Sequence, residues 1–319
     1  MLTKPIIKIP KVVVIGGGTG VFTVLSGLRK YNLDLTAIVS MADDGGSSGT
    51  LREEFGILPP GDARRALVAL AHTDNQMLSE LFNYRFTEGR LTGHAFGNLL
   101  LTALERITGS FEGALSEAGR ILNVRGRVIP VTLDKVRLCA KLEDGTVVRG
   151  ETNIDIPKHD PRLRVKKIYL EPRAKGNKNA VRVLKEADLI VMGPGDLFTS
   201  VLPNLLVRGV PVAIRKSKAK KVFVVNTMTK VGETNSFKVN DFLFEVEKYL
   251  GRGVLNYIVV NTKKPPHTRL VEYEREGKIM VGTGSLSSKP IPILGNFIRT
   301  SGFVRHDPEK LSKVLVSLL

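Results

Sequence analysis

The chain has 319 residues, and the 42% that are hydrophobic are enough for a large core in one α/β domain or two closely joined ones. Its single cysteine excludes a disulfide framework and a cysteine-based zinc site, and it fits a reducing compartment. The formal charge of +17 is concentrated in residues 158–186 and 208–221. This surplus favours nucleic acid, phosphate-bearing ligands or an acidic partner, or else it is a solvated basic surface.

The first residues, MLTKPIIKIPK, interleave lysine and proline with apolar residues, which is not the pattern of a signal peptide. The apolar runs elsewhere are too short to span a bilayer. We therefore predict a cytoplasmic protein without a membrane span. Aromatic residues make up only 6% and no RNA-binding signature is present, so nucleic acid is the weaker explanation of the charge.

The chain opens with a predicted βαβ unit. KVVVIGG (11–17) is an unbroken β-branched run, typical of a strand buried on both faces of a parallel sheet. A helix is predicted over 19–30 and a second strand, LTAIVSM, over 35–41. Helical patterns then dominate from 62 to 122.

Residues 124–172 have a different pattern. Apolar and polar residues alternate through KVRLCAKL, and the Asp-Gly pair at 144–145 predicts a tight hairpin turn. We predict a small antiparallel β insertion here, within a single domain that covers 1–319.

The α/β alternation returns after 178. Further buried strands are predicted at 221–228 and 255–261, and PEKLSKVLVSLL predicts a closing helix. The fold class expected from this order is α/β, with an open, mostly parallel sheet and helices on both faces.

A glycine-rich turn, Gly16-Gly17-Gly18-Thr19-Gly20, joins the first strand to its helix. Such a turn lets a ligand approach the backbone, and the helix N-terminus offers free N–H groups to phosphate. It is neither a G-x-G-x-x-G fingerprint nor a P-loop. A tight packing turn without a ligand is the alternative.

Two adjacent acids, Asp43 and Asp44, follow the second strand and precede GGSSG. An acid at this place often accepts hydrogen bonds from ribose hydroxyls. Successive side chains diverge, so we expect one acid to face the ligand or a Mg²⁺ ion. The other, with Asp44 the first choice, is expected to cap the following turn.

Three polar residues at predicted helix starts complete this half of the candidate site. Asp62, in PPGDARRAL, either caps its helix or faces the ligand, and Arg64 and Arg65 after it can reach phosphate. In GHAFGN, His94 and Asn98 are candidates for hydrogen bonding to a ligand. His94 is also a candidate general base, and a structural cap is as reasonable.

A second glycine turn, Gly193-Pro194-Gly195, ends another predicted strand, and Thr199 and Ser200 follow it. We predict that this turn and the first one border a shared crevice. NTMTKVGET adds a third polar segment after a strand, from which Asn226 and Thr229 are candidates. The chain contains no G-x-S-x-G, HExxH or cysteine nucleophile motif that would indicate covalent catalysis.

Taken together, the segments resemble one family over nearly the whole chain. VVVIGGGTGVFTVLSGLR, ADDGGSSGTLR, PPGDARRALVALA, LTGHAFGNLLL, GPGDLFTSVLPNLL, NTMTKVGET and VRHDP occur in the order found in the YvcK family of bacterial gluconeogenesis factors. These proteins are related to CofD, the 2-phospho-L-lactate transferase. The resemblance implies a Rossmann-like three-layer fold and a regulatory protein that binds UDP-sugars, notably UDP-N-acetylglucosamine. It also implies a role in cell shape and cell-wall precursor supply on gluconeogenic carbon sources.

The resemblance also assigns residues near the C-terminus. Arg305 in VRHDP matches a family arginine linked to nucleotide-sugar binding, and Tyr273 matches an aromatic partner of the base. The family usually has Ser-Leu-Tyr after its Gly-Pro-Gly, whereas this chain has Asp196-Leu197-Phe198. A carboxylate there repels a diphosphate unless a metal or a lysine intervenes, or else Asp196 caps the helix.

The expected ligand is thus a UDP-sugar, with Mg²⁺ as a possible companion at Asp43 or Asp44 and NAD or another dinucleotide as a less suitable ligand. The expected partner is a cytoplasmic protein of cell-wall precursor metabolism, and a homodimer is allowed. The alternatives are a metal-dependent transferase acting on a nucleotide-linked substrate and a salt-sensitive nucleic-acid binder.

Overall fold

A computed structural model describes residues 8–72 and 76–319. Its main element is a seven-stranded sheet in the order β10-β9-β8-β7-β1-β2-β3, in which every neighbouring pair is parallel. The strands are β1 (Lys11–Gly16), β2 (Asp34–Val39), β3 (Arg127–Pro130), β7 (Leu189–Met192), β8 (Lys220–Val224), β9 (Tyr257–Asn261) and β10 (Ile291–Gly295). The predicted α/β class with an open, mostly parallel sheet is confirmed.

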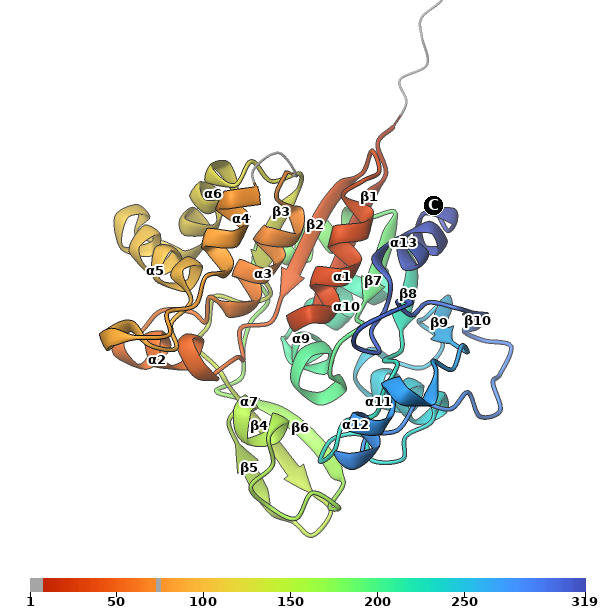
Figure 1. The fold of residues 1–319 in the computed structure, drawn as a ribbon. Helices are drawn as coiled ribbons and strands as arrows, with labels where there is room; N and C mark the ends of the chain where they lie inside the picture. The colour runs from red at the N-terminus through yellow and green to blue at the C-terminus, as the bar shows by residue number, and fades with distance from the viewer. Residues whose placement is uncertain (1–7, 73–75) are drawn as a thin grey trace, which may run out of the picture.

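Helices cover both faces of this sheet. They are α1 (Gly18–Leu28), α2 (Gly46–Phe55), α3 (Gly61–Leu70), α4 (Gln76–Asn83), α5 (Phe96–Thr108), α6 (Phe111–Ile121), α8 (Lys178–Glu186), α9 (Leu202–Leu206), α10 (Val210–Lys216), α11 (Val239–Leu250), α12 (Val271–Arg275) and α13 (Pro308–Ser317). Short turns are η1 (Gly89–Leu91), η2 (Leu197–Val201) and η3 (His267–Arg269). Helices α3 and α13 pack against α1 in front of the sheet in Figure 1. None of the helices in the described ranges is long and apolar enough to cross a bilayer.

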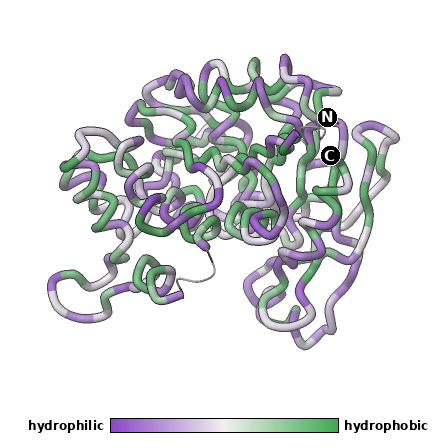
Figure 2. Tube along the Cα trace, turned by 90° about the horizontal axis from the view of Figure 1, so that it is seen from above, coloured by the Kyte–Doolittle hydropathy of each residue, from purple (hydrophilic) through white to green (hydrophobic). Residues whose placement is uncertain are grey.

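The core lies between these layers. In β1, Val12, Val13, Val14 and Ile15 are fully buried, because helices on both sides exclude water from alternate faces of the strand. Along the helices in Figure 2, hydrophobic and hydrophilic residues alternate, as expected for helices with one face on a buried sheet.

A second sheet is small and antiparallel, in the order β5-β4-β6. It comprises β4 (Arg137–Leu142), β5 (Val147–Arg149) and β6 (Val165–Glu171), and the short helix α7 (Glu151–Asp155) follows β5. The β-rich insertion expected at 124–172 is therefore present, but its antiparallel strands begin at 137. Residues 127–130 form β3, which pairs with β2 in the large sheet.

The strand order reverses at the centre of the large sheet. From β1 the chain moves outward to β2 and β3, and it then returns to the other side of β1 with β7, β8, β9 and β10. In open α/β sheets, ligands bind at the carboxyl ends of the strands where this reversal occurs. Both predicted glycine turns, after β1 and after β7, lie at that point.

Candidate functional site

A cavity of about 590 Å³ opens at the reversal point, between the ends of β1 and β7, the small helix α7 and the segment 273–306. We refer to it as the main cavity. Its lining includes these residues expected from the sequence: Gly17, Gly18, Thr19, Gly20, Asp43, Asp62, Asn98, Gly195, Thr199, Ser200, Asn226, Thr229, Tyr273 and Arg305. The expected residues Gly16, Asp44, His94 and Gly193 are not part of the lining.

The start of α1 is occupied by an acid of the protein itself. The backbone N–H of Gly18 donates to Asp62 Oδ1 at 2.8 Å. A Cβ on Gly17 would lie 2.3 Å from Asp62 Oδ2, so a side chain there would displace this carboxylate. The expected cradle of free N–H groups is thus wrong for Gly18, because Asp62 holds the place that a phosphate oxygen would take.

The two glycine turns pack directly on each other. A Cβ on Gly20 would lie 1.8 Å from the carbonyl oxygen of Pro194, closer than any real contact. The N–H of Gly195 donates to Asn226 Oδ1 at 2.8 Å, which ties the second turn to the end of β8. Gly193 has φ +73°, a conformation that side chains disfavour. Glycine is needed at these positions for packing as well as for any ligand.

An acid also occupies the start of η2, after the second turn. Glu233 accepts from the N–H of Phe198 at 3.0 Å and from the hydroxyl of Thr199 at 3.1 Å. Asp196 makes no side-chain capping bond, so the expectation that it caps this helix is wrong. The hydroxyl of Thr199 is engaged with Glu233, whereas Ser200 Oγ has no hydrogen-bond partner in the described part of the chain and lies near Gly18.

The adjacent acids of the first half diverge as expected, but Asp43 takes both expected roles, and Asp44 does not cap the turn. Asp43 lines the main cavity and also accepts from the N–H of Gly45 at 3.0 Å, so it is the acid that caps the turn. Asp44 Oδ1 accepts from the N–H of Thr152 at 2.9 Å, at the start of α7. Asp44 therefore fixes the insertion against the large domain instead of facing the cavity.

The GHAFGN segment supports the wall behind Asp43. Ser47 Oγ contacts His94 Nδ1 at 3.3 Å and accepts from Asn98 Nδ2 at 3.1 Å. Asn98 Oδ1 in turn accepts from buried Arg64 Nε at 3.0 Å. The guanidinium of Arg64 is thus bonded within the protein, although Arg64 and Ser47 both line the main cavity. His94, which contacts Ser47, is not part of the lining. Arg65, which also lines the cavity, is half exposed and lies 3.9 Å from Asp62, so it is freer than Arg64 to reach a phosphate. The role of His94 as a general base stays a prediction.

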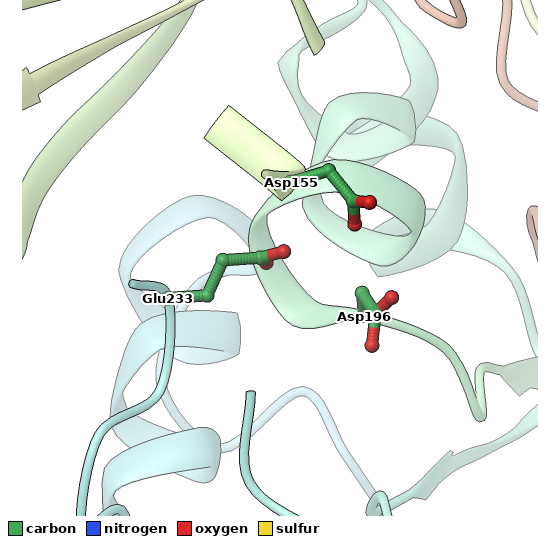
Figure 3. Close-up of side chains that lie close together, drawn as sticks. All are labelled: Asp155, Asp196 and Glu233. Carbon is green, nitrogen blue, oxygen red and sulfur yellow. The ribbon is translucent and has the colours of Figure 1, made fainter. Parts of the chain in front are cut away.

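A cluster of acids around one lysine closes the cavity on the side of the insertion. Carboxylate oxygens of Asp155, Asp196 and Glu233 lie within 4.8 Å of one another, and Figure 3 shows the three side chains converging from α7 and two loops. Lys230 Nζ lies 2.8 Å from Asp155 and 3.6 Å from Asp196. Burial alone would lower the pKa of Lys230, but the charges of Asp196 and Asp155 raise it. Lys230 is the intervening lysine that the sequence argument required beside Asp196.

Further acids line the wall between α7 and the start of α1. Burial, and then the charge of Asp43, raises the pKa of Asp62 from 3.8 to about 6. Glu151 of α7 also lines the cavity, and burial followed by repulsion from Asp43 raises its pKa from 4.5 to about 9. Because ionising them is costly, this wall favours protons or a cation.

The C-terminal segment supplies the aromatic and cationic wall. The hydroxyl of Tyr273 accepts from the N–H of Val304 at 3.1 Å, which fixes the ring beside the cavity. The guanidinium of Arg305 lies 5.0 Å from the ring centre of Phe303 and is exposed. His306 is buried next to them, and burial lowers its pKa to about 4, so it is neutral. Within the described residues the Arg305 side chain has no acidic partner, so it can meet an anionic ligand here.

Sequence analysis missed Glu151, Asp155, Lys230 and Glu233. Lys230 and Glu233 lie within NTMTKVGET, where only Asn226 and Thr229 were singled out. Thr229 Oγ1 accepts from the N–H of Ile279 at 2.9 Å. The lysine and glutamate of that segment carry its charges at the cavity. The sequence signal that could have identified them was a pair of opposite charges in a loop directly after a buried strand.

We expect the folded protein to lose stability as the pH rises from about 5 to about 9. Burial raises the pKa of Glu151 from 4.5 to about 9, and that of Glu233 to about 8. The unfolded chain releases these protons near pH 4.5 but the folded protein retains them, so stability is complete below that pH. Above it, the free energy of unfolding falls by up to about 1.4 kcal/mol per pH unit for each of the two groups. The fall ends once the pH exceeds the pKa of that group in the folded protein.

The midpoint of urea unfolding, measured across this range, checks the expected loss. Glu151→Gln should flatten the curve, whereas Glu171→Gln, at an exposed glutamate of β6, should leave it unchanged. The same slope in wild type and Glu151→Gln would contradict the assignment.

Comparison with known proteins identifies relatives over nearly the full length. A family model described as 2-phospho-L-lactate transferase CofD matches residues 12–291. A Clostridium acetobutylicum protein, provisionally assigned as a gluconeogenesis factor, is 43% identical over 98% of this chain and 70% of its own. The gluconeogenesis factor of Bacillus subtilis is 41% identical over 97% of this chain and 98% of its own. A crystal structure of a Bacillus halodurans protein of the UPF0052 family has a TM-score of 0.91 at 38% identity, covering 97% of this chain and 99% of that one.

Proposed function

The chain belongs to the CofD family, in the branch that contains the gluconeogenesis factors, and from this premise we propose that it is a regulatory protein that binds a nucleotide sugar. The proposed ligand is UDP-N-acetylglucosamine. The observation that carries the proposal is the main cavity, where two glycine turns face a wall formed by Tyr273 and Arg305. Its volume of about 590 Å³ is within the usual range for small-molecule sites.

Each part of the ligand has a matching wall in this proposal. The ring of Tyr273 offers a stacking surface to uracil, and the free guanidinium of Arg305 offers a fork to the diphosphate. Ser200 Oγ and the exposed N-terminal turn of α1 at Thr19 face the same space. Asp43 is placed to accept hydrogen bonds from ribose or sugar hydroxyls.

The acids of the cavity suit a divalent cation that accompanies the diphosphate. Asp43, Asp62 and Glu151 all line the main cavity, and carboxylate oxygens are the ligands that Mg²⁺ prefers. Burial, followed by repulsion from Asp43, raises the pKa of both Asp62 and Glu151, and a cation at this place would offset that cost. When bound, the ion would neutralise charge between these acids and the phosphates. Asp44 is engaged with α7 and is not expected to take part.

The proposed role is to report the level of a cell-wall precursor during growth on gluconeogenic carbon sources, and so to support cell shape. In such a role the protein acts through a cytoplasmic protein partner whose behaviour changes with the ligand. A homodimer is compatible with it. NAD suits the site less well because the first turn lacks the dinucleotide fingerprint.

The second candidate function is a metal-dependent transferase acting on a nucleotide-linked substrate. It is favoured by the match of residues 12–291 to the transferase family model and by the cation-compatible acids of the cavity. It differs in predicting a product. A nucleic-acid binder would instead show affinity that falls steeply with salt and depends little on base or sugar.

Asp43→Asn should weaken binding of UDP-N-acetylglucosamine in Mg²⁺ by about tenfold, the size expected for one charge-assisted contact. The fold should persist, because the asparagine oxygen can still accept from the N–H of Gly45. Titration calorimetry and thermal melting measure the two effects. Asp44→Asn is the matched control, since it also retains its acceptor for Thr152 and does not line the cavity. Equal affinity in both variants would remove Asp43 from the site.

A further inference from the structure

A second cavity of about 500 Å³ adjoins the main cavity at the carboxyl end of β9. We call it the β9 pocket. It is lined by Met228, Asn261, Thr262, Lys264, Leu270, Glu274, Lys278, Ile279, Met280, Val281, Gly282 and Thr283. Two of these residues, Met228 and Lys278, line the main cavity as well, so the two spaces share a wall.

Helix α12 and the segment after it form the rest of that wall. On α12, Tyr273 lines the main cavity while its neighbour Glu274 lines the β9 pocket. Thr229 and Ile279 are joined by two hydrogen bonds, from the N–H of Thr229 to the carbonyl of Ile279 at 2.8 Å and from the N–H of Ile279 to Thr229 Oγ1 at 2.9 Å. A displacement on one side of this wall must therefore move residues on the other side.

The polar groups of the β9 pocket select for an anion. Lys264 makes no hydrogen bond or ion pair within the described residues, and Thr283 has no hydrogen-bond partner there either. Both polar atoms of the Asn261 side chain are already engaged. Its Oδ1 accepts from the N–H of Phe297, and its Nδ2 donates to the carbonyl of Lys263. Lys278 is paired with Glu276, just outside the lining, at 2.5 Å. Glu274, the acid of the lining, lies 3.9 Å from His267, so Lys264 is the cation of the lining that has no acidic partner within the described residues. Among the described residues, the pocket thus offers one ammonium group without an acidic partner, that of Lys264, and the unengaged hydroxyl of Thr283.

The remaining lining is apolar. Met228 and Val281 are buried, and Leu270, Ile279 and Met280 complete the surface. Methionine side chains adapt to ligands of different shape. A ligand that fits both parts of the pocket carries an acidic group on an apolar body, because an inorganic anion would leave the apolar surface in water.

We propose that the β9 pocket binds a small organic anion, a carboxylate or phosphate ester with an apolar body, and that its occupation changes the affinity of the main cavity. Lys264 and Thr283 hold the acidic group and Met228, Leu270 and Met280 contact the body. Coupling runs through α12 and the paired segments at Thr229 and Ile279. The binding site does not depend on the proposed function, whereas the coupling rests on it.

Phenyl phosphate and benzoate are the probes, because they carry the two acidic groups on the same apolar ring. Titration calorimetry should detect at least one of them, with inorganic phosphate binding about tenfold more weakly or not at all. Lys264→Glu should lower the affinity for the probe that binds by about tenfold or more. The matched control is Lys263→Glu, which changes the net charge equally at an exposed neighbour outside the pocket lining.

The variants separate this site from the main cavity. Arg305→Ala, which alters the main cavity alone, should leave probe binding intact. Loss of probe binding in Arg305→Ala but not in Lys264→Glu would overturn the proposal. Equal effects of Lys263→Glu and Lys264→Glu on probe binding would also overturn it, and so would the failure of both probes to bind.

The coupling is tested by titrating UDP-N-acetylglucosamine with and without saturating probe. A change of about threefold or more in its affinity, absent in Lys264→Glu, supports coupling, and an unchanged affinity overturns the coupling alone. If the nucleotide sugar does not bind at all, the proposed function fails, while the probe titrations still decide the pocket.

Discussion

Gly20→Ala should destabilise the protein by about 3 kcal/mol, the upper end of the cost of overpacking a core. The added methyl group would lie 1.8 Å from the carbonyl oxygen of Pro194, and that oxygen belongs to backbone that cannot rotate away. Alanine gains about 1 kcal/mol over glycine inside a helix such as α1, so helix propensity opposes the effect without cancelling it. The clash is expected to dominate.

Urea unfolding followed by circular dichroism measures this loss. Gly282→Ala is the control, because a Cβ there meets no atom within 4 Å. The same variant should also lose ligand binding, since the clash pushes the two glycine turns apart at the floor of the main cavity. A Gly20→Ala protein as stable as wild type would show that the turns are not in contact.

Lys230→Met should cost about 2 kcal/mol, somewhat less than for a fully buried pair, because the lysine side chain is 22% exposed. Methionine keeps much of the volume but leaves Asp155, Asp196 and Glu233 facing one another without a cation. The loss should shrink at low pH, because burial raises the pKa of Asp196 and Glu233 and both then carry protons. The repulsion among these acids would weaken the contact between α7 and the loops that follow β7 and β8 of the large sheet.

Unfolding at pH 5 and pH 8 measures this difference between wild type and variant. The control Lys278→Met removes a lysine whose ion pair within the described residues is with the exposed Glu276, and it should cost only about 0.5 kcal/mol. Asp155→Asn added to Lys230→Met should recover part of the stability. Equal costs for the two lysine variants at pH 8 would argue against the cluster as a clamp.

The large sheet could be predicted because its central strands are buried on both faces. Such strands consist of unbroken runs of β-branched residues, as in 11–17. The edge strand β10 gives no such signal, since its residues are half-buried or exposed. The glycine turns marked the reversal point for the same local reason: each must bring backbone close to backbone.

The charges of the site could not be predicted in the same way. Adjacent acids such as Asp43 and Asp44 are equivalent in the sequence, and only the position of α7 decides which one faces the cavity. Asp155 and Glu233 are far apart in the chain and meet only because the insertion folds back onto the loop after β8. Contacts of this kind depend on tertiary structure and leave no local pattern.

The most direct test of the proposed function is titration calorimetry of the protein with UDP-N-acetylglucosamine, with and without Mg²⁺, using GTP and NAD as comparators and mass analysis for products. The account predicts saturable, selective binding of the UDP-sugar, weakened in Arg305→Ala, with no product. Failure to bind it would contradict the account, and conversion of any of the nucleotides would favour the transferase instead.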